Sequence, residues 1–297
     1  MSKKFLVPLD GSKLAEQALP WAELLAQATD SKLELLSCYE PPASVYMLPD
    51  FAAPPPVYFD QASQHKEMEQ YLHKTRAALP QGLAALKQCE GDAGMAILDR
   101  ASSGEIDAII MASHGRGGLG RWLLGSVATK IVRGSKIPVL VVNASTQVPP
   151  HPKVERILVP LDGSELAEIG LEHALELAQP LGAEVRLYQG VPHTPIGNPT
   201  LDAAVEFEVI NAQEYLDKIK SRYPDARLTT KVKVAGPTLG IVEESEDCDL
   251  VVMSSHGRSG FRRWLLGSIA ENVLQAIHKP LLIVYNHEHG QEGESSP

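Results

Sequence analysis

The chain has 297 residues, 44% hydrophobic and 22% charged, which is typical of a globular protein long enough for two domains. Its formal net charge of −10 argues against broad nucleic-acid binding, because that needs a positive surface to displace the counterions of phosphate. No window approaches the ~20 apolar residues of a membrane span, and the apolar run behind the first lysines is too short for a signal peptide. We therefore expect a soluble, cytoplasmic protein without nucleic-acid or membrane partners.

Strand and helix patterns alternate along the first half of the chain. Nearly continuous apolar runs predict strands, and apolar residues at helical spacing predict helices. In chain order, the predicted elements are strand 4–9, helix 14–25, strand 33–38, helix 61–79, strand 82–89, helix 95–102, strand 107–111, helix 126–133 and strand 139–142. This βαβαβαβαβ order implies a parallel sheet covered by helices on both faces.

The second half of the chain repeats the first in three long blocks. Leu6-Val-Pro-Leu-Asp-Gly-Ser12, Ser113-His-Gly-Arg116 and Arg121-Trp-Leu-Leu-Gly-Ser126 return from Leu158, Ser255 and Arg263. The offset is 152 at the first block and 142 at the others, so the first copy carries ten extra residues, which we place in the Pro-rich stretch 41–60. Strands of the second copy are expected near Arg156, Glu184, Leu228, Leu250 and Leu281. A period this long indicates domain duplication.

The repeat predicts two tandem α/β domains, each a doubly wound, mostly parallel five-stranded sheet with helices on both faces. We expect the first domain at 1–143, a linker at 144–153, the second domain at 154–286 and a polar tail at 287–297. The stretch 41–60 contains four aromatic residues. It can serve as a lid or partner surface, or be a plain loop that tucks its aromatic side chains onto the domain.

Cysteine usage favours unpaired thiols. The three cysteines, Cys38, Cys89 and Cys248, form no CxxC pair, and an odd number does not suit a disulfide framework. We therefore expect three partly buried free cysteines in a reducing compartment. No set of metal-ligating residues stands out.

Polar residues follow the first strand of each copy. In open α/β sheets, ligands bind beyond the carboxyl ends of the strands, which is where Asp10 and Asp162 lie. Each aspartate can cap the next helix, or can accept a hydrogen bond from a nucleobase amine or a ribose hydroxyl. Ser12 and Ser164 are available for the cap, which leaves the aspartates for a ligand.

A glycine-rich loop follows the fourth strand of each copy. Gly115 and Gly125 recur as Gly257 and Gly267 with the same spacing, and the second glycine of each pair precedes a helix. Backbone N–H groups in such a loop, together with the positive end of the helix, suit an anion such as phosphate. The loop matches neither a Walker P-loop nor the dinucleotide fingerprint, so kinase, P-loop ATPase and dehydrogenase functions lose their main support.

Two histidines, His114 and His256, close the fourth strands and are candidate general bases. The alternative is a strand-end histidine held by backbone hydrogen bonds. No carboxylate stands at a spacing that would orient either imidazole, so the second interpretation is favoured.

Each half resembles a universal stress protein domain, and the chain resembles the tandem form of that family. The resemblance rests on the Val-Pro-Leu-Asp-Gly-Ser strand end, Ser-His-Gly-Arg after the fourth strand, Leu-Leu-Gly-Ser at a helix start and the closing Pro-Val-Leu-Val-Val. It implies a Rossmann-like fold that binds ATP, ADP or AMP, with Mg²⁺ arriving only as part of the nucleotide complex. It further implies regulation by binding, with at most a slow ATPase activity and no catalytic residue.

The resemblance carries the family's Gly-x2-Gly-x9-Gly-Ser/Thr motif onto this chain, where Ala112 and Ser254 replace its first glycine. By the same resemblance, Asp10 and Asp162 meet the adenine or ribose, and Cys38 and Gly190 line the base pocket. The expected nucleotide-binding residues are Pro8, Asp10, Cys38, Ala112, His114, Gly115, Arg116, Gly125 and Ser126 in the first half, and Pro160, Asp162, Gly190, Ser254, His256, Gly257, Arg258, Gly267 and Ser268 in the second.

Two functions compete. The first is a nucleotide-binding stress-response regulator, and the second is a scaffold that has lost nucleotide binding and acts through protein partners or another small ligand. In either case, we expect the edge strands 139–142 and 281–285 to pair within the chain, since paired apolar edges are protected from aggregation. The resulting two-domain unit can dimerise further.

Overall fold

The computed structural model describes residues 3–39, 61–114, 124–143, 148–192, 199–256 and 266–286. The first half contains β1 (Lys4–Pro8), the 3-10 helix η1 (Ala15–Ala18), α1 (Leu19–Ala28), β2 (Lys32–Tyr39), α2 (Gln61–Ala77), β3 (Ala84–Glu90), α3 (Ala93–Ala101), β4 (Ala108–Ala112), α4 (Ser126–Gly134) and β5 (Val139–Val142). The second half contains β6 (Arg156–Pro160), α5 (Glu165–Leu181), β7 (Glu184–Val191), α6 (Pro199–Ser221), β8 (Leu228–Val234), α7 (Pro237–Ser245), β9 (Leu250–Ser254), α8 (Ser268–Ala276) and β10 (Leu281–Val284).

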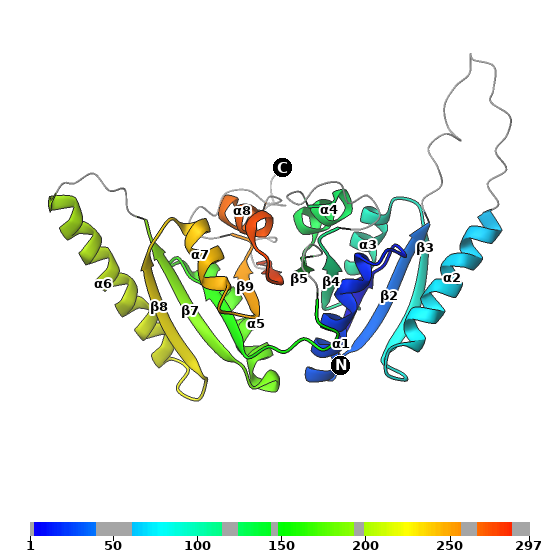
Figure 1. The fold of residues 1–297 in the computed structure, drawn as a ribbon, viewed down its shortest axis with the longest axis horizontal. Coiled ribbons are helices and arrows are strands. Elements are labelled where there is room, and N and C mark those ends of the chain that lie inside the picture. The colour runs from blue at the N-terminus through cyan, green and yellow to red at the C-terminus, as the bar shows by residue number, and fades with distance from the viewer. Residues whose placement is uncertain are drawn as a thin grey trace, which may run out of the picture.

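These elements build one ten-stranded sheet in the order β3-β2-β1-β4-β5-β10-β9-β6-β7-β8. Within each half, neighbouring strands are parallel, as the alternation of strands and helices predicts. The halves join where β5 and β10 pair antiparallel, with Leu140 opposite Leu282. Figure 1 shows the two halves on either side of this seam, with α2 and α6 at the outer ends. The expected pairing of the edge strands within one chain is thus confirmed.

Helices cover both faces of the sheet, and each face has its own apolar core that runs through both halves. One core includes Trp21 of α1, Leu72 of α2 and Leu171 of α5. The other includes Ile131 of α4 and Ile241 of α7. This is the doubly wound arrangement expected of parallel strands that are buried on both faces. None of the described helices is long and apolar enough to cross a membrane.

The extra residues of the first copy lie in two places, which corrects the prediction of a single insertion. The offset between copies is 152 at β1 and β6, 144 at β3 and β8, and 142 at β4 and β9. Eight extra residues therefore fall between β2 and β3, and the other two fall between α3 and β4. Sequence blocks far apart reveal only the total difference, because the weak similarity between them does not fix the intermediate register.

The segment after β1 differs in detail from the single predicted helix. It opens with the short η1 and continues as α1, which has a proline in its first turn. In the second half, the equivalent α5 is one continuous helix capped by Ser164. Proline is tolerated in a first turn, where its missing N–H would lack a partner, so the α-helix of the first half begins later.

The cysteine prediction was wrong for two of the three residues. Cys38 on β2 and Cys89 on β3 are register partners with a Cα–Cα distance of 4.5 Å, and they form a disulfide. Cys248 is a free, buried thiol, and burial raises its pKa to about 11. Counting cysteines cannot reveal this pair, since the strand register that brings Cys38 and Cys89 together is a tertiary feature.

Candidate functional site

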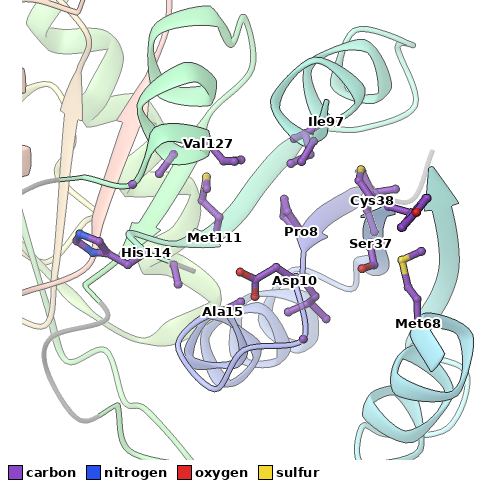
Figure 2. Close-up of a pocket in the computed structure, with 18 of the residues that line it drawn as sticks. Pro8, Asp10, Ala15, Ser37, Cys38, Met68, Ile97, Met111, His114 and Val127 are labelled. Carbon is purple, nitrogen blue, oxygen red and sulfur yellow. The ribbon is translucent and has the colours of Figure 1, made fainter. Parts of the chain in front are cut away.

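A cavity of about 810 Å³ lies at the carboxyl ends of β1, β2 and β4 in the first half. Helix α2 forms one wall and the start of α4 another. Figure 2 shows Asp10 facing this cavity, with His114 on one side and Cys38 on the other. The predicted binding residues that line it are Pro8, Asp10, Cys38, Ala112, His114, Gly125 and Ser126.

A second cavity of about 560 Å³ occupies the equivalent place in the second half. The predicted residues that line it are Pro160, Asp162, Gly190, Ser254, His256, Gly267 and Ser268. Both volumes fall in the range of about 300–1,000 Å³ that is usual for small-ligand pockets. The structure therefore brings the described predicted residues of each half to one cavity. Gly115, Arg116, Gly257 and Arg258 lie outside the described residues.

The aspartate and the serine after the first strand of each half make different hydrogen bonds. The Asp10 carboxylate accepts a hydrogen bond from the Ser12 N–H at 2.9 Å, while the Ser12 hydroxyl accepts one from the Ala15 N–H at 3.1 Å. In the second half, Asp162 accepts from the N–H and the hydroxyl of Ser164, which in turn caps α5. Ser164 therefore caps α5, Ser12 accepts from the first N–H of η1, and both aspartates line the cavities.

Glycines begin the helices that face the two cavities. Gly125 and Gly267 are the N-caps of α4 and α8, and no described side chain caps either helix. A Cβ on Gly125 would stand 3.3 Å from the carbonyl oxygen of Ser113, and one on Gly267 would stand 3.0 Å from that of Ser255. The same carbonyls accept hydrogen bonds from these glycines' N–H groups. Glycine therefore permits this close backbone approach. Because no described side chain caps α4 or α8, their first N–H groups remain open towards the cavities.

Ala112 and Ser254 end β4 and β9 in ordinary backbone conformation. Among the described residues, Asp30 is the only non-glycine with a positive φ, so neither position needs a conformation that favours glycine. Ser254 also donates a hydrogen bond from its hydroxyl to the carbonyl of His256 at 2.5 Å. Replacing the motif's first glycine consequently adds a small side chain without backbone strain.

The two histidines are held by a neighbouring serine hydroxyl, whereas the sequence analysis expected backbone hydrogen bonds. The Nδ1 of His114 lies 3.1 Å from the Ser113 hydroxyl, and His256 makes the same contact with Ser255. Each Nε2 is buried, with no hydrogen-bond partner among the described residues. Burial lowers the pKa of His114, so its imidazole is neutral at neutral pH. A serine contact at Nδ1 supplies no carboxylate to orient a general base.

The structure adds cavity residues that the sequence motifs did not indicate. Met68 and Tyr71 reach the first cavity from α2, and Ile97 reaches it from α3. Tyr188 on β7 lines the second cavity and is 1% exposed. A Cβ on Gly240 of α7 would come within 2.1 Å of the Tyr188 hydroxyl, so that glycine provides the room for the phenol. A comparison of the two copies could have singled out Tyr188, because the equivalent strand position in the first half is Leu36.

Tyr188→Phe is expected to raise the free energy of unfolding by about 1 kcal/mol, because the buried hydroxyl has no partner among the described residues. Urea unfolding measures the change. Tyr285→Phe is the matched control, since the Tyr285 hydroxyl donates to the Val132 carbonyl at 2.6 Å and its removal should cost about 1 kcal/mol. Equal destabilisation by both substitutions would show that Tyr188 has a structural hydrogen-bond partner.

No group of three or more His, Cys, Asp or Glu side chains that could hold a metal ion occurs in the part of the chain that the structure describes. The polar atoms at the cavities are instead suited to hydrogen bonding. Each cavity presents a helix N-terminus, an aspartate and a half-buried histidine whose Nε2 is buried, among polar and apolar side chains. Such a combination suits a ligand with an anionic end and a polar ring system.

Comparison with known proteins identifies the family. A model of the universal stress protein family matches residues 1–143 and 153–285, so the chain belongs to this family and contains two of its domains in tandem. A universal stress protein of Mycolicibacterium smegmatis is 28% identical over 288 residues, which cover 94% of this chain and 96% of the relative. One from Mycobacterium tuberculosis is 27% identical over 288 residues, with 94% and 95% covered.

Solved structures share the complete two-domain fold. A universal stress protein from Archaeoglobus fulgidus has a TM-score of 0.64 and 21% identity, covering 97% of this chain and 98% of that one. A functionally unknown protein from Pseudomonas aeruginosa has a TM-score of 0.67 and 20% identity, covering 96% and 92%. At these identities, the likeness establishes the fold alone.

Proposed function

We propose that this chain is a cytoplasmic, nucleotide-binding stress-response regulator that binds one adenine nucleotide in each half and acts by binding rather than turnover. The observation that carries the proposal is the uncapped helix N-terminus at each cavity. The N-caps of α4 and α8 are glycines, no described side chain caps either helix, and the first residues of both helices line the cavities. Such helix ends attract phosphate groups.

The residues present fit a nucleotide. Gly125 and Ser126, with Gly267 and Ser268, would hold phosphate groups through backbone N–H groups. A Cβ at either glycine would require the nearby carbonyl to shift by a few tenths of an ångström. Asp10 and Asp162 would accept hydrogen bonds from a ribose hydroxyl or a base amine. The bound nucleotide would act as the regulatory signal, since ATP, ADP and AMP differ in the number of phosphate groups and in the Mg²⁺ that they bring.

The site's chemistry supports binding over catalysis. His114 is neutral and contacts a serine, and no carboxylate among the described residues orients it as a general base for water attack. The protein would then change its partner contacts with nucleotide occupancy. The alternative is a scaffold that binds no nucleotide. The replacement of the motif's first glycine by Ala112 and Ser254 favours this alternative.

The Ser126→Asp/Ser268→Asp variant is expected to bind Mg-ATP at least about tenfold more weakly than wild type, because each new carboxylate would face the phosphates. Both serines are exposed and occupy the first position of their helices. A carboxylate at this position stabilises a helix by about 0.3–1 kcal/mol through the helix dipole, so we expect the double variant to fold. Calorimetry measures the affinity, and thermal unfolding checks the fold.

Ser126→Ala/Ser268→Ala is the matched control, because it removes the same hydroxyls without adding charge and should keep binding within about threefold of wild type, since the backbone N–H groups remain. Wild-type protein that takes up no ATP, ADP or AMP would favour the scaffold. Equal affinity in the Asp and Ala variants would show that the phosphates do not approach these helix ends.

A further inference from the structure

The Cys38–Cys89 pair stands at the edge of the first cavity. Both residues are half-buried near the carboxyl ends of β2 and β3, and Cys38 lines the cavity. In Figure 2, Cys38 lies beside Ser37, on the side of the cavity away from His114. The register pair at the same place in the second half is Gly190 and Lys233, so the second cavity has no equivalent.

We propose that Cys38 and Cys89 form a reversible oxidation site for hydroperoxides, and that their redox state sets the shape of the first cavity. A peroxide that enters the cavity oxidises the Cys38 thiolate to a sulfenic acid and leaves as water or alcohol. The Cys89 thiolate then attacks that sulfur, forming the disulfide and releasing water after proton transfer. A dithiol reductant reverses the change and is itself oxidised to a disulfide.

The cavity changes shape because two unbonded thiols cannot occupy the space of one disulfide. Non-bonded heavy atoms stay roughly 3.5–4.0 Å apart, so reduction separates the two sulfur atoms. The β2–β3 ladder holds both backbones in register from Leu33 to Tyr39, which leaves side-chain rotation as the available movement. Because Cys38 lines the cavity, we expect its freed thiol to rotate into that space. The oxidised form is consequently the one with the more open first cavity.

Redox sensitivity reconciles the disulfide with a cytoplasmic location, where a reducing pool keeps most thiols unpaired. The third cysteine does not take part. Cys248 is 1% exposed, and burial raises its pKa to about 11, so it carries little of the reactive thiolate at neutral pH. It therefore serves as an internal control within the same chain.

The first test counts thiols in the full-length protein. Reduced protein should give three maleimide labels after denaturation, and protein treated with one equivalent of hydrogen peroxide should give one label, at Cys248. Cys248→Ser should keep the peroxide response, and Cys38→Ser/Cys89→Ser should abolish it. Three labels after treatment, or oxidation at Cys248 instead, would overturn the proposed oxidation site.

The second test follows the cavity by hydrogen exchange and by Mg-ATP calorimetry in both redox states. Oxidation should slow exchange at the ends of β2 and β3 and the start of α4, and leave β7 and α8 unchanged. The ATP arm rests on the proposed function, and first-cavity affinity should be about fivefold or more higher in oxidised protein. Absence of ATP binding with a retained exchange response would count against the nucleotide proposal alone. Identical exchange in both states would show a purely structural disulfide and overturn the inference.

Discussion

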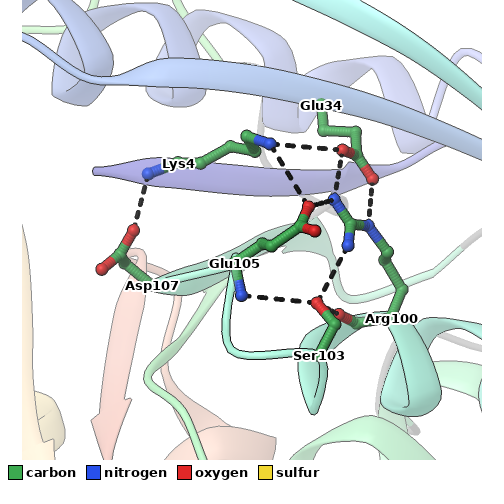
Figure 3. A network of polar contacts seen from close by, with 6 residues as sticks. All are labelled: Lys4, Glu34, Arg100, Ser103, Glu105 and Asp107. Atoms are coloured by element: carbon green, nitrogen blue, oxygen red, sulfur yellow. Dashed lines mark hydrogen bonds and ion pairs between the residues drawn. The ribbon is translucent and has the colours of Figure 1, made fainter. Parts of the chain in front are cut away.

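Arg100→Met is expected to lower the free energy of unfolding by about 3 kcal/mol, because it leaves a buried carboxylate without its main partner. Figure 3 shows the Arg100 guanidinium between Glu34 and Glu105. It donates to both carboxylate oxygens of Glu34, at 2.6 and 2.7 Å, and to Glu105 at 2.6 Å. Glu34 is 6% exposed, and Lys4 approaches it only to 3.9 Å, so Arg100 is its main partner.

The pH dependence gives this prediction a direct signature. Hydrogen bonding to Arg100 lowers the pKa of Glu34 below its usual value near 4.5, so the stabilisation is present at neutral pH and is lost as the pH falls through the lowered pKa. The stability difference between wild type and Arg100→Met should therefore narrow in acid. Urea unfolding from pH 7 to pH 3 would measure both effects.

The double variant Glu34→Leu/Arg100→Met is the control for the buried charge. Replacing both partners with apolar residues leaves no orphaned carboxylate, and the variant should regain most of the loss. A single Arg100→Met variant within about 0.5 kcal/mol of wild type would contradict the account, because it would place this pair among surface ion pairs of small effect.

Ile283→Asp is expected to cost more than about 4 kcal/mol and to disrupt the joined sheet, because it buries a charge at the seam. Ile283 pairs with Val139 across the antiparallel junction of β10 and β5, and both side chains are fully buried. Freed from each other, the two strands would expose unpaired apolar edges, which promote association between chains. Urea unfolding and light scattering would detect the loss of stability and the larger species.

Ile283→Val keeps the shape and polarity of the seam and should cost only about 1 kcal/mol. Arg133→Ala serves as a second control at the junction, since its ion pair with Glu271 joins α4 to α8 at the surface and should be worth less than about 1 kcal/mol. An Ile283→Asp protein with the oligomeric state and the urea midpoint of wild type would contradict this prediction and show that the seam tolerates a charge.

Much of the fold could be predicted because its signals are local and repeated. The apolar runs at Ala108 and Leu250 identify buried parallel strands, and the repeat fixes their order twice. The partners of side-chain ion pairs could not be predicted in this way, because they depend on the three-dimensional arrangement of strands and helices. The ion pair of Glu34 on β2 with Arg100 on α3 returns as Arg186 on β7 with Glu244, so the charges are exchanged between copies. Comparing the two halves residue by residue hides such a pair.

The location of the two cavities could be predicted in the same way, whereas the binding roles of their residues stay predictions. Strand-end positions such as Asp10 and helix starts such as Gly125 meet at one cavity because the carboxyl ends of parallel strands share an edge. Residues of α2 that line the first cavity, such as Met68, belong to no recognisable sequence motif. Their role becomes visible only when the three-dimensional position of α2 is known. The Cys38–Cys89 disulfide was missed for the same reason, since 51 residues separate its partners in sequence.

Native mass spectrometry of the full-length protein with Mg-ATP tests the central claim most directly, because it counts the nucleotides bound to each chain. The account predicts two nucleotides per chain at saturation, with binding at least about tenfold weaker in the Ser126→Asp/Ser268→Asp variant but not in Ser126→Ala/Ser268→Ala. A chain that retains no adenine nucleotide in either redox state would contradict the account and favour a scaffold that acts through protein partners.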